Sequence, residues 1–389
     1  MDDRCAVCLA PGMEVFYTAD GIPTNSCILL ATRDEAIDCP QGDMRLALCH
    51  HCGFMRNLAF ESALTEYSGR YEETQGFSGT FNAFHVSLAD ELIARHNLHK
   101  RDVIEIGCGK GEFLWLLADR GGNRCLGFDP SYSDGRLPAL TRGSLRVVRD
   151  FFGDAGVEAS ADFICCKMTL EHIANPRPLL AAVRRTADLR VDPIIFFQIP
   201  DTSRILTECA FEDIYYEHCS YFTSTSLVHL FEEFGFSISR VEAVYGGQYL
   251  TLEAGIQVAP DRTRSNEMLQ THTALTRSFS SRALEKINEW RHRLDRRAAS
   301  MSRVAVWGSG SKAVAFLSAV SRDSAVEYVV DINPMRRGHF MPRSGHEIVG
   351  PEDLVARPPD TVIIMNSIYR DEVLDTLDDL DLSPDVLTL

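Results

Sequence analysis

The most constraining feature of the sequence is the stretch from Val103 to Pro130, which reads VIEIGCGKGEFLWLLADRGGNRCLGFDP. Its apolar start is typical of a strand covered on both faces, and the closely spaced Gly107, Gly109 and Gly111 let the backbone turn sharply and approach a ligand. Asp129 ends the next predicted strand, where a carboxylate can accept both ribose hydroxyl protons of a nucleoside. The order strand, turn, helix and acid therefore predicts a nucleoside-binding unit in an α/β sheet.

The spacing of the glycines favours one class of nucleoside. Glu105 stands two residues before the first glycine, and the segment resembles the first motif of class I S-adenosylmethionine methyltransferases, E/DxGxGxG. This resemblance implies S-adenosylmethionine as the cofactor, contacted by Glu105 and the three glycines, with Asp129 as the ribose-binding acid. A dinucleotide, or a glycine turn that binds nothing, is the weaker alternative.

A second polar group follows the next predicted strand of this unit. The apolar run at 161–166 indicates a buried strand, and a loop with Glu171 and His172 comes shortly after it. Ligands of open α/β sheets bind at the carboxyl edge of the strands. We therefore expect Glu171 to contact the cofactor and His172 to donate to a substrate oxygen, with a structural histidine as an equal alternative.

Four of the twelve cysteines are paired by spacing. Two residues separate the members of each pair, so that two thiolates can bind one tetrahedral ion from a tight turn; the pairs are Cys5 with Cys8 and Cys49 with Cys52. The pattern favours a structural Zn²⁺ over unmetallated thiols, and a catalytic Zn²⁺ least, because four protein ligands leave no open coordination position. Other side chains are competing ligands: Cys27, Cys39, His50 and His51.

Length and composition exclude several classes of protein. With 389 residues, 45% of them apolar and 24% charged, the chain is typical of a globular protein with two or three domains. No stretch approaches the roughly 20 apolar residues that span a membrane, and the N-terminus has no signal core, so we expect a cytoplasmic protein without membrane partners. The net charge of −16 opposes binding to phosphate polymers, so we expect no nucleic-acid partner.

The densest group of reactive side chains lies between Asp213 and Phe222. Three tyrosines, an acid and a histidine within seven residues are too polar for a core, which favours a loop over the sheet. His218 can act as a general base, with Glu217 tuning its imidazole. A hydroxyl of Tyr215 or Tyr221 can donate to an oxygen that becomes negative. A hydrogen-bonded structural loop is the alternative.

A helical pattern runs from about Glu61 to Asn97, with apolar residues at three- and four-residue steps. Near its start, Tyr71 and Gln75 belong to a polar and aromatic patch. We expect these two residues to contact the substrate, and a solvated loop is an equally good interpretation.

The C-terminal part repeats the nucleotide-binding theme. Gly308 and Gly310 form a glycine turn after a predicted strand, Lys312 follows them, and Asp331 ends the next strand. The pattern GxGxxA with a downstream acid permits NAD. We favour binding of the acceptor by the two glycines and by Lys312, whose charge suits a diphosphate, with Asn366 at the end of a later strand. A structural turn without a ligand is the remaining alternative.

A predicted helix precedes this part of the chain. Leu284, Ile287, Trp290 and Leu294 fall on one side of it, and arginine and lysine side chains fall on the other. The pattern is typical of a solvated linker helix, and a diphosphate contact or a weak nucleic-acid surface is the alternative.

Nearly the whole chain resembles the three-domain C-methyltransferases that act on nucleotide-linked 4-keto-deoxysugars. The zinc cysteines, the cofactor motif and the signature Glu217-His218-x-x-Tyr221-Phe222 stand in the order of that family. The resemblance implies an α/β protein with a central class I methyltransferase sheet, a small N-terminal zinc-binding domain and a C-terminal Rossmann-like domain, at residues 1–60, 61–275 and 276–389. It places the catalytic base in the Glu217–His218 pair.

The same resemblance implies a reaction and a small-molecule partner. A sugar carbon becomes a nucleophile only after it loses a proton next to a ketone, so C-methylation needs a base, a donor at the ketone oxygen and an aligned methyl group. We therefore expect S-adenosylmethionine-dependent C-methylation of a keto-containing nucleotide sugar. The alternatives are a methyltransferase with a non-sugar natural-product or amine acceptor, a bifunctional NAD-dependent oxidoreductase and a non-enzymatic zinc scaffold.

Overall fold

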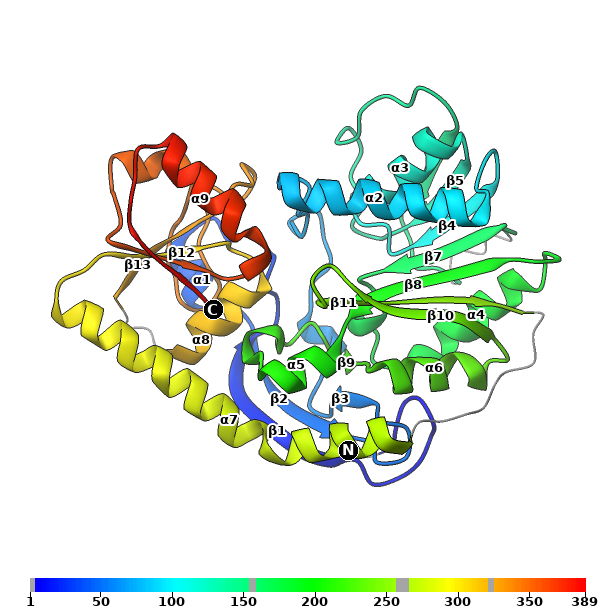
Figure 1. Cartoon of the computed structure of the whole chain (residues 1–389), viewed down its shortest axis with the longest axis horizontal. Helices are drawn as coiled ribbons and strands as arrows, with labels where there is room; N and C mark the ends of the chain where they lie inside the picture. Colours follow the sequence, from blue (N-terminus) through cyan, green and yellow to red (C-terminus); the bar gives the residue numbers. More distant parts are fainter. Residues whose placement is uncertain (1–3, 154–158, 257–265, 321–324) are drawn as a thin grey trace.

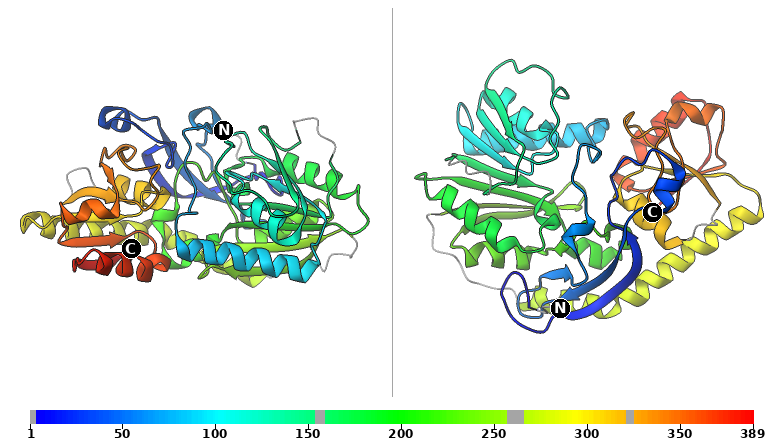
Figure 2. Two further views of the ribbon diagram at one scale, coloured as in Figure 1. Left: turned by 90° about the horizontal axis from the view of Figure 1, so that it is seen from above. Right: turned by 180° about the vertical axis from the view of Figure 1, so that it is seen from behind.

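The computed structural model describes residues 4–153, 159–256, 266–320 and 325–389. Two lobes stand side by side and are joined along one edge by an N-terminal sheet and a long helix, α7 (Figure 1). Figure 2 shows the same lobes from above and from behind, with the N-terminal segment (blue) between them. The predicted α/β class, with two separate α/β sheets and an N-terminal cysteine-containing unit, is confirmed.

The N-terminal unit is a four-stranded antiparallel sheet that takes its last strand from the middle of the chain. Its order is β1-β2-β3-β9, and the short helix α1 (Arg33–Ile37) lies between its first two strands in sequence; the strands are β1 (Glu14–Pro23), β2 (Gln41–Leu48), β3 (Met55–Asn57) and β9 (Ser220–Tyr221). Because β9 follows the segment with Glu217 and His218, this sheet holds one end of that segment.

The larger lobe is built on a seven-stranded sheet with the order β10-β11-β8-β7-β4-β5-β6. Its strands from β4 to β8 are parallel, and β11 pairs antiparallel with both of its neighbours. The strands are β4 (Asp102–Ile106), β5 (Arg124–Phe128), β6 (Ser144–Val148), β7 (Phe163–Lys167), β8 (Ile194–Pro200), β10 (Ser237–Val244) and β11 (Tyr249–Gly255).

Apolar side chains alternate between the two faces of this sheet, and each face is covered by helices. Helices α2 (Gly79–His96) and α3 (Glu112–Gly121) pack on one face, through residues such as Leu92 and Leu114. Helices α4 (Pro176–Ala187) and α6 (Ser224–Glu233) pack on the other, through residues such as Leu180 and Phe231, while α5 (Thr202–Glu208) follows β8. Short 3-10 helices are Ser62–Leu64, Leu170–His172, Phe211–Asp213, Pro351–Val355 and Ser367–Tyr369.

The helix predicted from Glu61 begins only at Gly79. Ser78 caps it, since its hydroxyl accepts a hydrogen bond from the N–H of Phe81 at 3.1 Å. Upstream of this cap the backbone forms only local turns and bonds to another segment: the N–H of Glu72 donates to the carbonyl of Cys27 at 2.9 Å. Tertiary pairing therefore overrides the helical pattern in this stretch.

The smaller lobe is a five-stranded parallel sheet with the order β14-β13-β12-β15-β16. Helix α8 (Ser311–Val320) packs on one face together with α7, and α9 (Arg370–Asp379) packs on the other. The strands are β12 (Val304–Trp307), β13 (Val326–Val330), β14 (Ile348–Val349), β15 (Thr361–Ile364) and β16 (Asp385–Thr388). The strand order changes direction at β12, the position at which open α/β sheets bind ligands.

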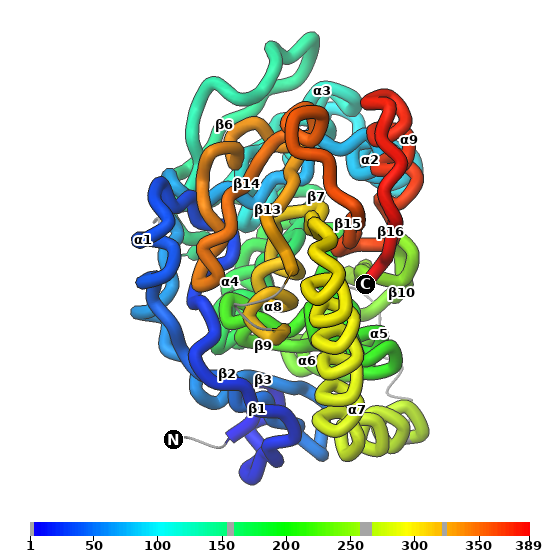
Figure 3. The backbone as a smooth tube through the Cα atoms, turned by 90° about the vertical axis from the view of Figure 1, so that its left-hand side faces the viewer, coloured from blue at the N-terminus to red at the C-terminus, as the bar shows by residue number. Residues whose placement is uncertain are grey.

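Helix α7 (Asn266–Ala299) passes from the N-terminal sheet to the C-terminal sheet (Figure 3). The expected apolar row is wrong in one residue, because Leu284 is 55% exposed and Ala283 takes its place beside Ile287, Trp290 and Leu294. The expected solvated side also makes contacts: the guanidinium groups of Arg282 and Arg291 donate to backbone carbonyls of other elements. The predicted division after residue 275 falls within this helix and stays a prediction.

In the described part of the chain, no helix is both long and apolar enough to cross a membrane.

We predict that Trp290→Ala lowers the free energy of unfolding by about 3–5 kcal/mol, because it removes a buried ring that packs edge-on against Phe316 at 5.4 Å. Leu284→Ala is the matched control, and we expect a change within about 0.5 kcal/mol. Urea unfolding followed by circular dichroism measures both. Equal losses in the two variants would contradict the packing of this helix.

Candidate active site

The glycine turn after β4 has a geometry that requires small residues. Gly107, Gly109 and Gly111 have φ values of 66°, 53° and 83°, which other residues adopt only with strain. A Cβ atom on Gly107 would lie 2.0 Å from the Oγ1 atom of Thr169. The chain can therefore follow this path only with glycine at the first position.

Asp129 lies beside this turn, directly after β5. Its carboxylate accepts hydrogen bonds from the N–H of Gly109 at 2.9 Å and from the N–H of Ser131 at 2.8 Å. The acid therefore stiffens the turn from the end of the neighbouring strand, where the ribose-binding acid of such units is expected.

Glu105 lies inside the sheet, below the turn, and is 3% exposed. Burial raises the pKa of this carboxyl to about 8, and the positive charge of Lys167 opposes the shift. Lys167 contacts the Nε2 atom of His85 at 2.9 Å, and burial lowers the pKa of this lysine to about 8. The expected contact of Glu105 with the cofactor stays a prediction.

The irregular segment before α2 lies between the glycine turn and the C-terminal sheet. On one side, the Nζ atom of Lys110 donates to the carbonyl of Tyr71 at 2.9 Å. On the other side, the carboxylate of Glu72 accepts from Asn333 at 3.0 Å, and its backbone carbonyl accepts from Arg336. This segment therefore joins the cofactor turn to the second sheet.

A cavity of about 270 Å³ lies between the two lobes. Residues at the carboxyl ends of strands from both sheets line it: Met168, Pro200, Gly308, Asp331 and Met365. Several of the predicted site residues also line it: Gln75, Tyr215, His218, Gly308, Gly310, Lys312 and Asn366. The two edges that bind ligands in open α/β sheets therefore face each other across one space.

Tyr215 and His218 form a hydrogen-bonded pair at this cavity, with 2.7 Å between the tyrosine hydroxyl and the imidazole Nε2 atom. Burial lowers the pKa of His218 well below its usual value, and the neighbouring His172 and Lys312 act in the same direction. Burial raises the pKa of Tyr215. The imidazole is therefore neutral at physiological pH, which is the form that can accept a proton.

His172 lies behind this pair rather than among the cavity residues. Its ring meets the ring of His218 edge-on at 4.8 Å, and its Nδ1 atom lies 3.0 Å from the hydroxyl of Tyr67. Burial lowers the pKa of His172 to about 4, and a hydrogen bond to the backbone of Glu217 opposes the shift. Glu171 lies in the same cluster, with ligand-type atoms of the three side chains within 4.8 Å of one another.

The expected pairing of Glu217 with the imidazole of His218 is wrong. The carboxylate of Glu217 instead accepts from the N–H of Ser26 at 2.8 Å and from the side chain of Asn25 at 3.3 Å. Burial raises its pKa, and a hydrogen bond from Tyr71 is among the contacts that oppose the shift. Glu217 therefore ties the segment to the N-terminal unit.

Tyr71 and Tyr221 contact residues of the site without lining the described cavity. Both are buried and neither belongs to the described cavity lining. The hydroxyl of Tyr221 donates to the carbonyl of Tyr215 at 3.4 Å. Contacts of these two tyrosines with the substrate or its oxygen, as the sequence predicts, therefore stay predictions.

The ammonium group of Lys312 forms an ion pair with a buried carboxylate at the wall of the cavity. Its Nζ atom and the guanidinium of Arg204 both form ion pairs with the carboxylate of Asp213. The two cations hold the pKa of Asp213 below its usual value despite burial. In the neighbouring turn, the carboxylate of Asp331 accepts from the N–H of Ser309 at 2.9 Å, as Asp129 does in the first sheet.

Gln75 and Asn366 lie where the two lobes meet across the cavity. Asn366 exchanges two hydrogen bonds of 2.9 Å with the side-chain amide of Gln248, and Gln75 accepts from the hydroxyl of Tyr369 at 2.6 Å. Close by, Glu372 accepts from the cap hydroxyl of α2 at 2.8 Å. The seam between the lobes on this wall is therefore made of polar side chains.

Sequence reasoning missed several cavity residues: Cys27, Glu73, Arg204 and Arg336. None of them belongs to a motif, and each reaches the cavity through tertiary contacts. The position of Arg204 one turn into the helix after β8 is the only local signal, because that helix begins at the carboxyl edge of the sheet. Cys27 is a competing metal ligand by sequence, but its Sγ atom lies 3.7 Å from the hydroxyl of Ser311 and outside the four-cysteine cluster.

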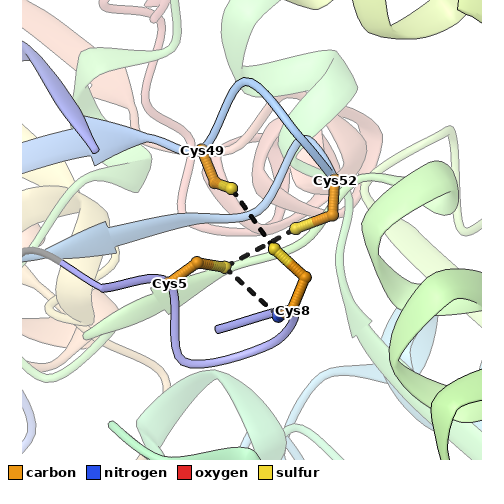
Figure 4. Close-up of side chains that lie close together, drawn as sticks. All are labelled: Cys5, Cys8, Cys49 and Cys52. Carbon is orange, nitrogen blue, oxygen red and sulfur yellow. Dashed lines mark hydrogen bonds between the residues drawn. The ribbon is translucent and has the colours of Figure 1, made fainter. Parts of the chain in front are cut away.

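A separate four-cysteine site lies in the N-terminal unit (Figure 4). The sulfur atoms of Cys5 and Cys52 lie 3.6 Å apart, as do those of Cys8 and Cys49. These distances are far too long for disulfide bonds of about 2.05 Å. A tetrahedral ion with metal–sulfur bonds of about 2.3 Å would place its ligands about 3.8 Å apart, so the cluster fits such an ion.

The order of the seven-stranded sheet, the glycine turn after β4 and the acid after β5 together define a class I S-adenosylmethionine-dependent methyltransferase. A methyltransferase domain matches residues 82–241, and a C-methyltransferase C-terminal domain matches residues 254–381. The chain therefore belongs to the S-adenosylmethionine-dependent C-methyltransferases. This membership excludes the alternative of a non-enzymatic zinc scaffold. The second glycine turn lies within the part of the chain that matches the C-methyltransferase C-terminal domain.

Among known proteins, the C-methyltransferase NovU of Streptomyces niveus is 25% identical over 366 residues, which cover 89% of this chain and 86% of NovU. Among solved structures, a methyltransferase of Aquifex aeolicus is 15% identical, with a TM-score of 0.34, and the match covers 43% of this chain and 89% of that one. The magnesium protoporphyrin IX methyltransferase of Synechocystis PCC 6803 is 18% identical, with a TM-score of 0.35, over 45% of this chain and 83% of that one.

We predict that Gly107→Ala weakens binding of S-adenosylhomocysteine more than about tenfold, because the added methyl group needs a strained φ and collides with Thr169. Gly69→Ala is the control, since a Cβ atom there meets no atom within 4 Å. Isothermal titration calorimetry measures both affinities. Wild-type affinity in Gly107→Ala would show that the turn does not hold the cofactor.

Proposed function

We propose that this protein transfers a methyl group from S-adenosylmethionine to a carbon next to the ketone of a nucleotide-linked keto sugar. One observation carries the proposal: the Tyr215–His218 pair lines the same cavity as the second glycine turn and its cationic neighbours. A base and a hydroxyl donor therefore lie beside a space whose other wall offers the second glycine turn and Lys312 to the charged nucleotide part of an acceptor. The matching C-methyltransferase C-terminal domain supports carbon as the methylated atom.

The cofactor is held by the first glycine turn in this proposal. Gly107, Gly109 and Gly111 let the backbone approach it, and Asp129 receives its ribose hydroxyls. When bound, S-adenosylmethionine supplies an electrophilic methyl group on a sulfonium. The protein must then generate the carbon nucleophile itself.

His218 removes the proton from the sugar carbon. Its Nε2 atom lies 2.7 Å from the hydroxyl of Tyr215, so this nitrogen already faces a residue of the cavity wall. With substrate present, the Tyr215 hydroxyl donates to the ketone oxygen as negative charge develops there, and Nε2 is released for the carbon-bound proton. Glu217 holds the segment in place through Ser26 and Asn25.

The acceptor's nucleotide part lies on the second sheet. The N-terminus of α8 presents backbone N–H groups next to Gly308 and Gly310, which suits a phosphate. Lys312 adds a positive charge. Arg204 pairs with the same carboxylate, that of Asp213, so Asp213 still has a cationic partner when Lys312 or Arg204 contacts a diphosphate. Gln75 and Asn366 close the opposite wall.

We further propose that the four-cysteine site binds a structural Zn²⁺. Four thiolates satisfy a tetrahedral ion and leave no position for water or substrate, so the ion stabilises the N-terminal unit and takes no part in the reaction. The cysteine pair Cys49 and Cys52 precedes β3, which pairs with β9 next to His218. The ion thereby supports the sheet that carries one end of the catalytic segment.

A panel of nucleotide-linked keto sugars, scored by mass for the gain of one methyl group, tests the proposed function. We predict methylation of a 4-keto sugar by the wild type and a fall of about 100-fold or more in kcat for His218→Asn, with S-adenosylhomocysteine affinity unchanged. In deuterated water, the wild type exchanges the sugar proton and the variant does not. Methylation only of acceptors that lack a ketone would contradict the proposal, and undiminished turnover in His218→Asn would contradict the base.

Elemental analysis of the purified protein tests the metal. We expect about one zinc per chain in the wild type and almost none in Cys49→Ser, because three thiolates hold the ion far less tightly. Cys39→Ser is the matched control, since Cys39 lies outside the cluster, and it should keep the wild-type content. Equal zinc content in the two variants would exclude this site.

A further inference from the structure

One carboxyl group in the active-site region lacks hydrogen-bond partners. Glu171 is 2% exposed, and neither of its side-chain oxygens has a hydrogen bond to another described residue. Burial raises the pKa of this carboxyl to about 8, so a neighbouring N–H donor would stabilise its charged form. Most buried polar atoms are paired, and leaving one unpaired costs about 1–3 kcal/mol. Retention of such a group therefore calls for a role that offsets this cost.

The position of Glu171 indicates which group it serves. It lies in the 3-10 helix Leu170–His172, directly after β7, and it is not among the residues that line the cavity. A carboxyl oxygen of Glu171 lies within 4.8 Å of an imidazole nitrogen of both His172 and His218. A small side-chain rotation or one bridging water closes such a gap. Glu171 thus lies behind the histidine that faces the cavity.

The other contacts of the two imidazoles leave one nitrogen available. His172 uses Nδ1 with the hydroxyl of Tyr67, and a hydrogen bond to the backbone of Glu217 engages the same ring. His218 uses Nε2 with the hydroxyl of Tyr215. The Nδ1 atom of His218 is therefore the nitrogen that a carboxylate behind the ring can reach.

We propose that Glu171 is a positioning residue that accepts a hydrogen bond from the Nδ1–H group of His218. The contact fixes the tautomer in which Nε2 carries the lone pair, and it stabilises the imidazolium that forms when Nε2 takes the sugar proton. No other bond changes: the proton moves from the sugar carbon to Nε2, and the Nδ1 proton stays on nitrogen. The inference rests on the proposed base and assigns its carboxylate partner to Glu171 instead of Glu217.

The tautomer can be measured without any acceptor. Protein labelled with ¹⁵N-histidine gives long-range ¹H–¹⁵N correlations for each ring, and the signals missing from His218→Gln identify His218. We expect the Nδ1–H tautomer in the wild type and its loss or a mixture in Glu171→Gln. An Nε2–H tautomer in the wild type would overturn the proposal, even if the keto-sugar function is correct.

Kinetics with the keto sugar found active distinguish positioning from other roles. We expect Glu171→Gln to lower kcat about 100-fold with the KM for the sugar unchanged, and Glu171→Asp to restore about a tenth of the activity or more. Glu217→Gln is the matched control, and its His218 tautomer should remain that of the wild type. If Glu171→Gln lowers the affinity for S-adenosylmethionine as strongly as it lowers kcat, Glu171 contacts the cofactor and the proposal is wrong.

A metal at this cluster is the other outcome that would overturn the proposal. Wild-type protein titrated with Co²⁺ would then bind a second ion beyond the cysteine site, and Glu171→Gln would not. We expect one Co²⁺ per chain in both proteins, with the absorption of thiolate ligation alone.

Discussion

The pairing of β3 with β9 is the interaction on which the active site depends. Met55 pairs with Tyr221, and Arg56 pairs with Ser220, so a strand of the N-terminal sheet holds the chain directly after His218. Glu217 adds a buried side-chain contact to Ser26 within the same unit. Because backbone hydrogen bonds and a buried carboxylate fix this segment together, the N-terminal unit and the Tyr215–His218 pair form one framework.

The second constraint is that two parallel sheets turn their carboxyl edges toward each other. One edge carries the glycine turn at 107–111 and the other the turn at 308–310, and the segment around Glu72 connects them. The second turn lines the cavity directly, whereas the first turn is not among its described lining residues, and the first sheet reaches the cavity through Met168 and Pro200. On the wall of the cavity that includes Gln248 and Asn366, polar side chains join the two lobes.

Local patterns predicted the elements better than the contacts between them. The glycine turn, the cysteine pairs and the strands were readable because strand, turn and ligand spacing are encoded within short stretches. The surroundings of His218 could not be predicted: Glu217 is its neighbour in sequence but contacts the N-terminal unit, whereas Glu171, distant in sequence, lies within 4.8 Å of it. Likewise Arg204 enters the cavity from a helix without a motif. Long-range contacts of this kind depend on how the chain is arranged in space, which cannot be derived from local patterns in a single sequence.

In the proposed reaction, the methyl donor and the acceptor bind at the facing edges of the two sheets, beside the cavity that Tyr215 and His218 line. Hydrogen–deuterium exchange of the full chain tests it most directly, with S-adenosylhomocysteine and a nucleoside diphosphate added singly and together. We expect protection of residues 107–113 by the first ligand, of 308–314 by the second, and of 213–219 when both are present. Protection of the 308–314 segment by neither ligand, or by S-adenosylhomocysteine alone, would contradict it.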